Sequence, residues 1–169
     1  MGDVPHVRMS KEEERAELES TSLAAANAMK LFRDGYNCSQ AVFCTFAPRF
    51  GLDADVAAGI SSSFGGGMGR MREVCGAVTG MFMAAGLAKG YRDPEAKTEK
   101  TMHYELIQKI ADKFRELNGS IVCRELLGLA HGGADNPKPD ERTKEYYQKR
   151  PCEILVGQAA SILEEVLKN

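Results

Sequence analysis

The sequence predicts an all-α protein, an irregular bundle of about seven helices in a single domain. Apolar residues recur at helical spacing along most of the chain, capping residues bound these segments, and no segment alternates as a strand would. A chain of 169 residues also suits one domain of ordinary size, whose core needs no disulfide or metal to fold. We assign residues 1–9 to a flexible N-terminal segment and residues 10–169 to the helical domain.

The composition limits the classes of function. Hydrophobic residues make up 43% and charged residues 27% of the chain, which argues against disorder. The 22 Lys and Arg residues against 24 Asp and Glu give a net charge of −2, so we expect no nucleic-acid partner. The charged N-terminal sequence lacks an apolar secretory signal, and the longest apolar run, residues 74–88, is too short to span a bilayer. We therefore expect no membrane insertion and a cytoplasmic location.

The first two expected helices begin at capping residues. Ser10 and Glu13 have the spacing of a capping box and open a charged helix predicted to reach Phe32. The helical periodicity of this segment also allows a homodimer. Asn37 opens the second helix, which Pro48 is expected to break near its end.

The third and fourth helices flank a cluster of glycines. Asp53 can cap a short third helix, which runs into the glycine cluster at 65–69. The fourth helix is predicted over residues 71–89 and ends at Gly90.

The remaining helices are separated by one unusually long connection. An Asp-Pro pair at 93–94 starts the fifth helix, and Gly119 ends it. The sixth and seventh helices are expected over residues 120–129 and 151–167. Residues 131–150 lie between them and are rich in charge and turn-forming residues, which is a long connection within a bundle.

Four of the five cysteines fall in the first turn or two of an expected helix, on its apolar side. These are Cys38, Cys75, Cys123 and Cys152. Free cysteine often behaves as a small buried hydrophobe, so packing could explain any one of them. However, helix N-termini stabilise thiolates, and four cysteines at such positions are more than packing requires. Cys44 lies on another side of its helix and is interpreted as a core residue.

The expected topology can bring these four thiols together. In an up-and-down bundle the second, fourth and sixth helices start at the same end. The connection at 131–150 is long enough to return the chain, so that the last helix starts at that end too. We therefore predict one four-cysteine site. The chain has no C-x-x-C or C-x-x-C-H motif, so spacing indicates neither a zinc ribbon, a thioredoxin motif nor haem c.

Arginine and glycine residues accompany Cys75. The glycine cluster matches no phosphate-binding motif and is better explained as a tight turn, which would bring Arg70 or Arg72 close to Cys75. A nearby arginine favours a thiolate or an anionic cluster. Gly76 and Gly80 each cost about 1 kcal/mol in a helix interior, so either another backbone approaches closely or a cofactor presses on the helix.

Residues 75–80 read CGAVTG, after an isolated cysteine in YNCSQAV and before Cys123 and Cys152. This arrangement resembles the four-cysteine family that is named after its C–GCAxxG–C–C pattern and described as redox-active. The resemblance covers residues 24–167. It departs from the family pattern at one point, because Cys75 precedes Gly76 instead of following it, which shifts the thiol by one helical position.

The resemblance implies that Cys38, Cys75, Cys123 and Cys152 are the functional residues and leaves Cys44 outside. Some relatives join this module to haem-binding sequence and are thought to carry an iron–sulfur centre. This chain lacks the haem attachment motif, so only the iron–sulfur centre carries over.

We expect a redox protein in which the four cysteines ligate an iron–sulfur cluster for electron transfer, since four thiolates are the usual complement. Gly76, Gly80 and Arg70 are expected beside the cofactor, and an unidentified redox protein is the expected partner. Two alternatives stay open. The same cysteines could be catalytic in metal-free thiol–disulfide exchange or sensing. They could also hold a structural zinc ion, or the chain could be a helical partner module.

Overall fold

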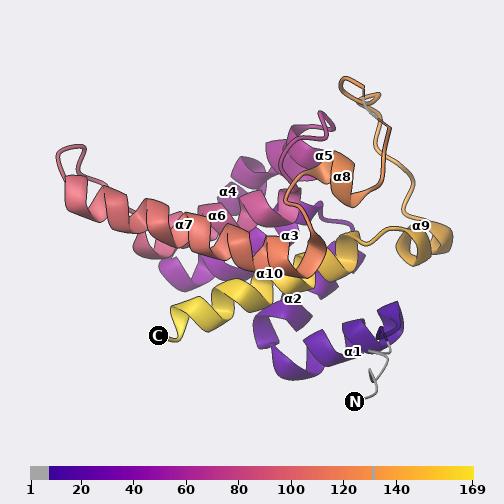
Figure 1. Ribbon diagram of the computed structural model, residues 1–169, viewed down its shortest axis with the longest axis horizontal. Helices are drawn as coiled ribbons and strands as arrows, with labels where there is room; N and C mark the ends of the chain where they lie inside the picture. The colour runs from indigo at the N-terminus through magenta and orange to yellow at the C-terminus, as the bar shows by residue number, and fades with distance from the viewer. Residues whose placement is uncertain (1–7, 131) are drawn as a thin grey trace, which may run out of the picture.

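The computed structural model describes residues 8–130 and 132–169, and within these ranges the all-α prediction is confirmed (Figure 1). Residues 1–7 of the expected flexible segment lie outside the described residues, as does position 131. The helices are α1 (Lys11–Thr21), α2 (Leu23–Arg33), α3 (Cys38–Phe46), α4 (Ala54–Ser61), α5 (Gly65–Met68), α6 (Gly76–Lys89), α7 (Lys97–Asn118), α8 (Cys123–Leu126), α9 (Lys144–Lys149) and α10 (Cys152–Leu167), with the 3-10 helices η1 (Ala47–Phe50) and η2 (Ser62–Phe64).

The single helix predicted from Ser10 to Phe32 is wrong, because Ser22 divides it. The backbone of Ser22 is extended, with φ −136° and ψ 117°. Its N–H donates to the carbonyl oxygen of Leu18 and ends α1, whereas its hydroxyl oxygen accepts from the N–H of Ala25 and starts α2. One serine therefore caps two helices. The capping box at Ser10 is confirmed.

The helix predicted over residues 71–89 starts later than expected, because the chain before Cys75 is not helical. Arg70 and Arg72 have φ values of +66° and +60°, which an α-helix cannot include. The helix therefore begins only at Gly76. The expected third helix is also shorter, because α4 ends at Ser61 and a 3-10 turn follows it.

Three further boundaries differ from the prediction. Asp93 forms a turn in which its carboxylate accepts from the N–H of Glu95, so α7 starts at Lys97. The helix expected over 120–129 is reduced to α8. The long connection contains α9, which Thr143 caps by accepting from the N–H of Tyr146. These breaks divide the seven expected helices into more and shorter ones.

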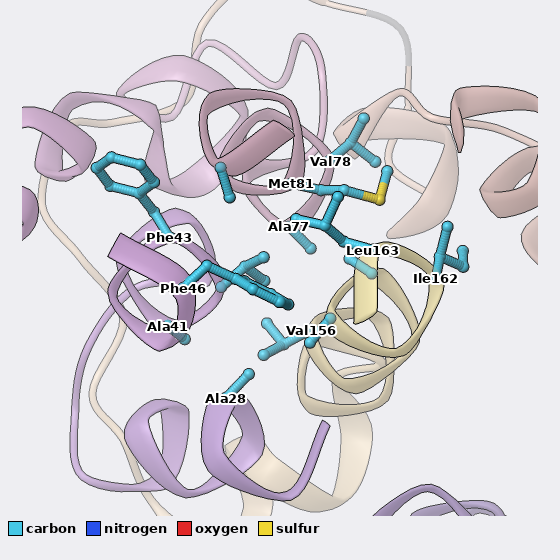
Figure 2. Close-up of a cluster of buried hydrophobic side chains, with 14 of the residues drawn as sticks. Ala28, Ala41, Phe43, Phe46, Ala77, Val78, Met81, Val156, Ile162 and Leu163 are labelled. Atoms are coloured by element: carbon cyan, nitrogen blue, oxygen red, sulfur yellow. The ribbon is translucent and has the colours of Figure 1, made fainter. Parts of the chain in front are cut away.

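The core lies between α2, α3, α6 and α10. Figure 2 shows Phe46 of α3, Met81 of α6 and Leu163 of α10 meeting there, and all three side chains are fully buried. Burying apolar surface of this kind is the main driving force for packing these helices. Three of the four core helices, α3, α6 and α10, begin at or directly after a cysteine. The core therefore fixes where these thiols lie.

The most extended helix in Figure 1 is α7, which reaches well beyond α6 on one side of the molecule. It is anchored by Ile110 and Phe114, which are fully buried. The apolar helix α6 has 14 residues, fewer than the roughly 20 that span a bilayer. Within the described ranges, no helix has the length and apolar character needed to cross a membrane.

Candidate functional site

The structure brings the four singled-out cysteines to one cavity of about 200 Å³. Each cysteine stands at the start of a helix. Cys38 is the first residue of α3, Cys75 directly precedes α6, Cys123 is the first residue of α8, and Cys152 is the first residue of α10. All of them are free thiols in the described chain.

Main-chain hydrogen bonds fix Cys75 beside Cys123. The N–H of Cys75 donates to the carbonyl oxygen of Ile121 at 2.8 Å. The N–H of Cys123 donates to the main-chain carbonyl oxygen of Glu73 at 2.6 Å. Between these two bonds, Val74 and Val122 form an antiparallel bridge. The segments that carry two of the thiols are thus joined directly through the backbone.

Close contact between α3 and α6 brings Cys38 to the same place. A Cβ atom added at Gly76 would lie 3.1 Å from the Cβ of Cys38, and one added at Gly80 would lie 2.7 Å from the carbonyl oxygen of Ser39. Both glycines therefore allow the two helices to approach closely. Close approach of another backbone, the first of the two explanations offered above, thus accounts for glycine at these helix positions. Gly76 also lines the cavity, whereas Gly80 faces α3 and is not among the lining residues.

The glycine loop forms one wall of the cavity. Gly66, Gly67 and Gly69 have left-handed φ values, as a tight turn requires. A Cβ atom at Gly67 would lie 2.6 Å from the Cβ of Cys123. Only glycine therefore fits where this loop packs against α8.

The two arginines of this loop share one partner, because both pair with Asp135, Arg70 at 3.9 Å and Arg72 at 2.8 Å, but their other contacts differ. Arg70 lines the cavity, but its side chain donates to the carbonyl oxygen of Asn136 and pairs with Asp140 at 3.3 Å. Arg72 is 4% exposed, and its Nη1 atom lies 3.6 Å from the Sγ atom of Cys123. Arg72, not Arg70, is therefore the arginine that contacts a thiol, and the contact is with Cys123 instead of Cys75.

The segment around α9 supplies cavity residues that were not predicted from the sequence. Arg142 donates to the carbonyl oxygens of Phe32 and Tyr36, and its guanidinium carbon lies 5.1 Å from the ring centre of Tyr146. Arg150 pairs with Asp140 at 2.7 Å. The clue in the sequence was the aromatic pair at 146–147 in an otherwise polar connection that leads directly to Cys152.

The thiols differ in acidity. A hydrogen bond from Cys38 lowers the pKa of Cys152 to about 7, against the effect of burial, and Arg150, Arg142 and Arg72 lower it further. The same hydrogen bond raises the pKa of Cys38 well above its usual value. Burial raises the pKa of Cys75 to about 12.

Cys123 is buried, as Cys75 is, but it has a cationic neighbour. Burial raises its pKa, although the hydrogen bond from Arg72 opposes that rise. Tyr146 also lines the cavity, and burial raises its pKa to about 12. Without a cofactor, Cys152 is thus the thiol that ionises most readily.

All four thiols line the cavity, but they are not grouped as the ligands of a single metal ion. Across the described ranges, no three His, Cys, Asp or Glu side chains are placed to hold a single metal ion. A zinc ion would need four sulfur atoms at about 2.3 Å from one centre.

The other candidates lie away from the cavity. Cys44 is half-buried against the hydrophobic core, and burial raises its pKa. This position agrees with its interpretation as a core residue. His103 is half-buried on α7 beside the ring of Tyr91 and does not line the cavity.

A family model matches residues 36–166 of the chain, a range that includes all four cavity cysteines. Comparison with curated proteins and with solved structures finds no match. The family is described as "Putative redox-active protein (C_GCAxxG_C_C)". Because the match extends over most of the sequence, the chain belongs to this C_GCAxxG_C_C family.

Proposed function

We propose that the protein is an electron-transfer protein whose four cysteines ligate an iron–sulfur cluster. The observation that carries this proposal is the convergence of Cys38, Cys75, Cys123 and Cys152, each from a different helix start, on one cavity. The redox description of the family supports the same class of chemistry. The electron donor and acceptor would be another redox protein, and the free thiols suit a reducing cytoplasm.

The donor set and its surroundings suit such a cluster. Four thiolates are the usual ligands of [2Fe–2S] and [4Fe–4S] centres, and when bound such a centre supplies one-electron transfer. Its negative charge would be offset by the N-termini of α3, α6 and α10 and by the buried guanidinium of Arg72. Leu126, Leu127 and Leu155 add apolar side chains to the lining of the cavity.

A structural zinc ion fits less well. One zinc ion needs all four sulfurs around a single point, and the described part of the chain offers no such group. A cluster distributes its ligands over several iron atoms, so thiols spread around a cavity suit it better.

Metal-free disulfide exchange is the second candidate, favoured by the hydrogen bond between Cys38 and Cys152. The Cys152 thiolate would attack a substrate disulfide, break its S–S bond and form a mixed disulfide, and the substrate thiolate that leaves would take a proton from solvent. Cys38 would then lose its proton to solvent and displace the second thiol. The protein would be left with a Cys38–Cys152 disulfide and the substrate reduced by two electrons. This chemistry gives Cys75 and Cys123 no role, so we rank it second.

Metal and sulfide analysis of anaerobically purified protein separates these functions. The proposal predicts iron and acid-labile sulfide in stoichiometric amounts, with visible absorbance that dithionite bleaches. A colourless protein in which oxidised glutathione forms a Cys38–Cys152 disulfide would support the second candidate instead. Stoichiometric zinc without any redox response would contradict both.

A further inference from the structure

Arg72 has a backbone conformation that side-chain-bearing residues rarely adopt, with φ +60°. Neighbouring hydrogen bonds hold it there. The N–H of Glu73 donates to the carbonyl oxygen of Gly67. The N–H of Arg124 donates to the carbonyl oxygen of Arg72 itself. Backbone strain of this kind persists where the surroundings over-determine it and is concentrated at functional sites.

This backbone conformation accompanies a buried guanidinium that has two partners. Its Nε atom lies 2.8 Å from Oδ2 of Asp135, and its Nη1 atom lies 3.6 Å from Sγ of Cys123. The N–H of Asp135 donates to the carbonyl oxygen of Arg70, so the carboxylate is tied to the same loop. A buried guanidinium needs compensating partners, and here one of them is a sulfur of the proposed centre.

We propose that Arg72 is a positioning residue of the redox centre, which acts through the sulfur of Cys123, is oriented by Asp135, and raises the centre's reduction potential. This inference rests on the proposed iron–sulfur function. Reduction adds one electron to the centre and breaks no bond of the chain. A hydrogen bond and a positive charge at a ligand sulfur stabilise the more negative, reduced state.

The test is a redox titration with dithionite and mediators on anaerobically purified wild-type, Arg72→Gln, Arg72→Lys and Arg70→Gln proteins. Arg70→Gln is the matched control, because it removes one positive charge and one ion pair to Asp135, at 3.9 Å, from the same loop while the contact of Arg72 with sulfur is kept. At the wild-type midpoint, Arg72→Gln is expected to lower the ratio of reduced to oxidised centre about tenfold, or about 59 mV for one electron. Arg70→Gln is expected to give a clearly smaller change.

Arg72→Lys keeps the charge but cannot reach both partners, so it is expected to shift the potential in the same direction by less. It also serves if Arg72→Gln fails to fold. Asp135→Asn tests the orienting role, because its shift in the wild-type background should vanish in the Arg72→Gln background.

Two results would overturn the inference, and they are distinguishable. If the wild-type protein binds no iron or sulfide, the proposed function fails and the inference fails with it. If the wild type is loaded but Arg72→Gln leaves the potential unchanged, or shifts it no more than Arg70→Gln does, only the inference fails.

Discussion

The thiol of Cys38 donates a hydrogen bond to the sulfur of Cys152, although α3 and α10 lie near opposite ends of the sequence. The bond stabilises a thiolate on Cys152 and makes Cys38 harder to ionise. This relationship gives the cavity one acidic thiol, which matters both for binding a metal cluster and for disulfide exchange.

In the metal-free protein, ultraviolet thiolate absorbance is expected to titrate with a component near pH 7, which belongs to Cys152. Because the pKa is lowered, the thiolate is present above that pH and is lost as the pH falls through it. Cys38→Ala removes the donor and should move this component to higher pH. Cys44→Ala is the control and should leave it in place, whereas equal shifts in both variants would contradict the assignment.

Single cysteine substitutions should divide the five thiols into two groups. Cys75→Ser is expected to abolish most bound iron and sulfide, because it removes a proposed ligand at the start of α6. Cys44→Ser should retain the wild-type content, since Cys44 packs against the core and does not line the cavity. Iron and sulfide analysis of both variants is the measurement. Equal loss in the two would mean that the roles are assigned wrongly.

Gly80→Ala should weaken the packing of α6 on α3. The new Cβ atom would lie 2.7 Å from the backbone oxygen of Ser39, so the helices must separate, at a cost of about 1–3 kcal/mol. Gly86→Ala on the same helix is the control, because the nearest atom that its new Cβ would meet is Nε2 of His103, at an ordinary contact distance of 4.0 Å. That change should leave stability unchanged or raise it by up to about 1 kcal/mol. Denaturant unfolding of the two variants decides between these outcomes.

Ser22→Ala should destabilise the protein by about 1–2 kcal/mol, because the Ser22 hydroxyl is the side-chain cap of α2. Ser20→Ala is a suitable control, since Ser20 is exposed on α1 and its hydroxyl donates only to the carbonyl oxygen of Glu17. Thermal and denaturant unfolding would measure both. A loss of stability no larger than that of the control would show that the cap at Ser22 contributes little.

Local signals account for the parts of the fold that the sequence predicts. The capping box at Ser10 and the cap at Asn37 are recognised from neighbouring residues alone, and both are present. The helical periodicity likewise predicts the all-α class. Placing Cys38 and Cys152 at helix starts follows from the same local patterns.

The missed features depend on contacts between distant segments. A serine such as Ser22 is tolerated within a helix, so only tertiary packing decides that the helix breaks there. The left-handed backbone of Arg72 is held in part by a hydrogen bond from the N–H of Arg124, which lies far along the chain. The same holds for Arg142, whose partners Phe32 and Tyr36 belong to the first part of the sequence.

The cavity draws its thiols from four places along the chain, the last of them at the start of α10. The complete set is present only in a stretch that extends at least from Cys38 to Cys152. Loading of the proposed cluster is therefore expected to require the docking of α10 and to stabilise that helix in its place. If the proposed cluster binds, its visible absorbance would then report the fraction of the protein in which α10 is docked.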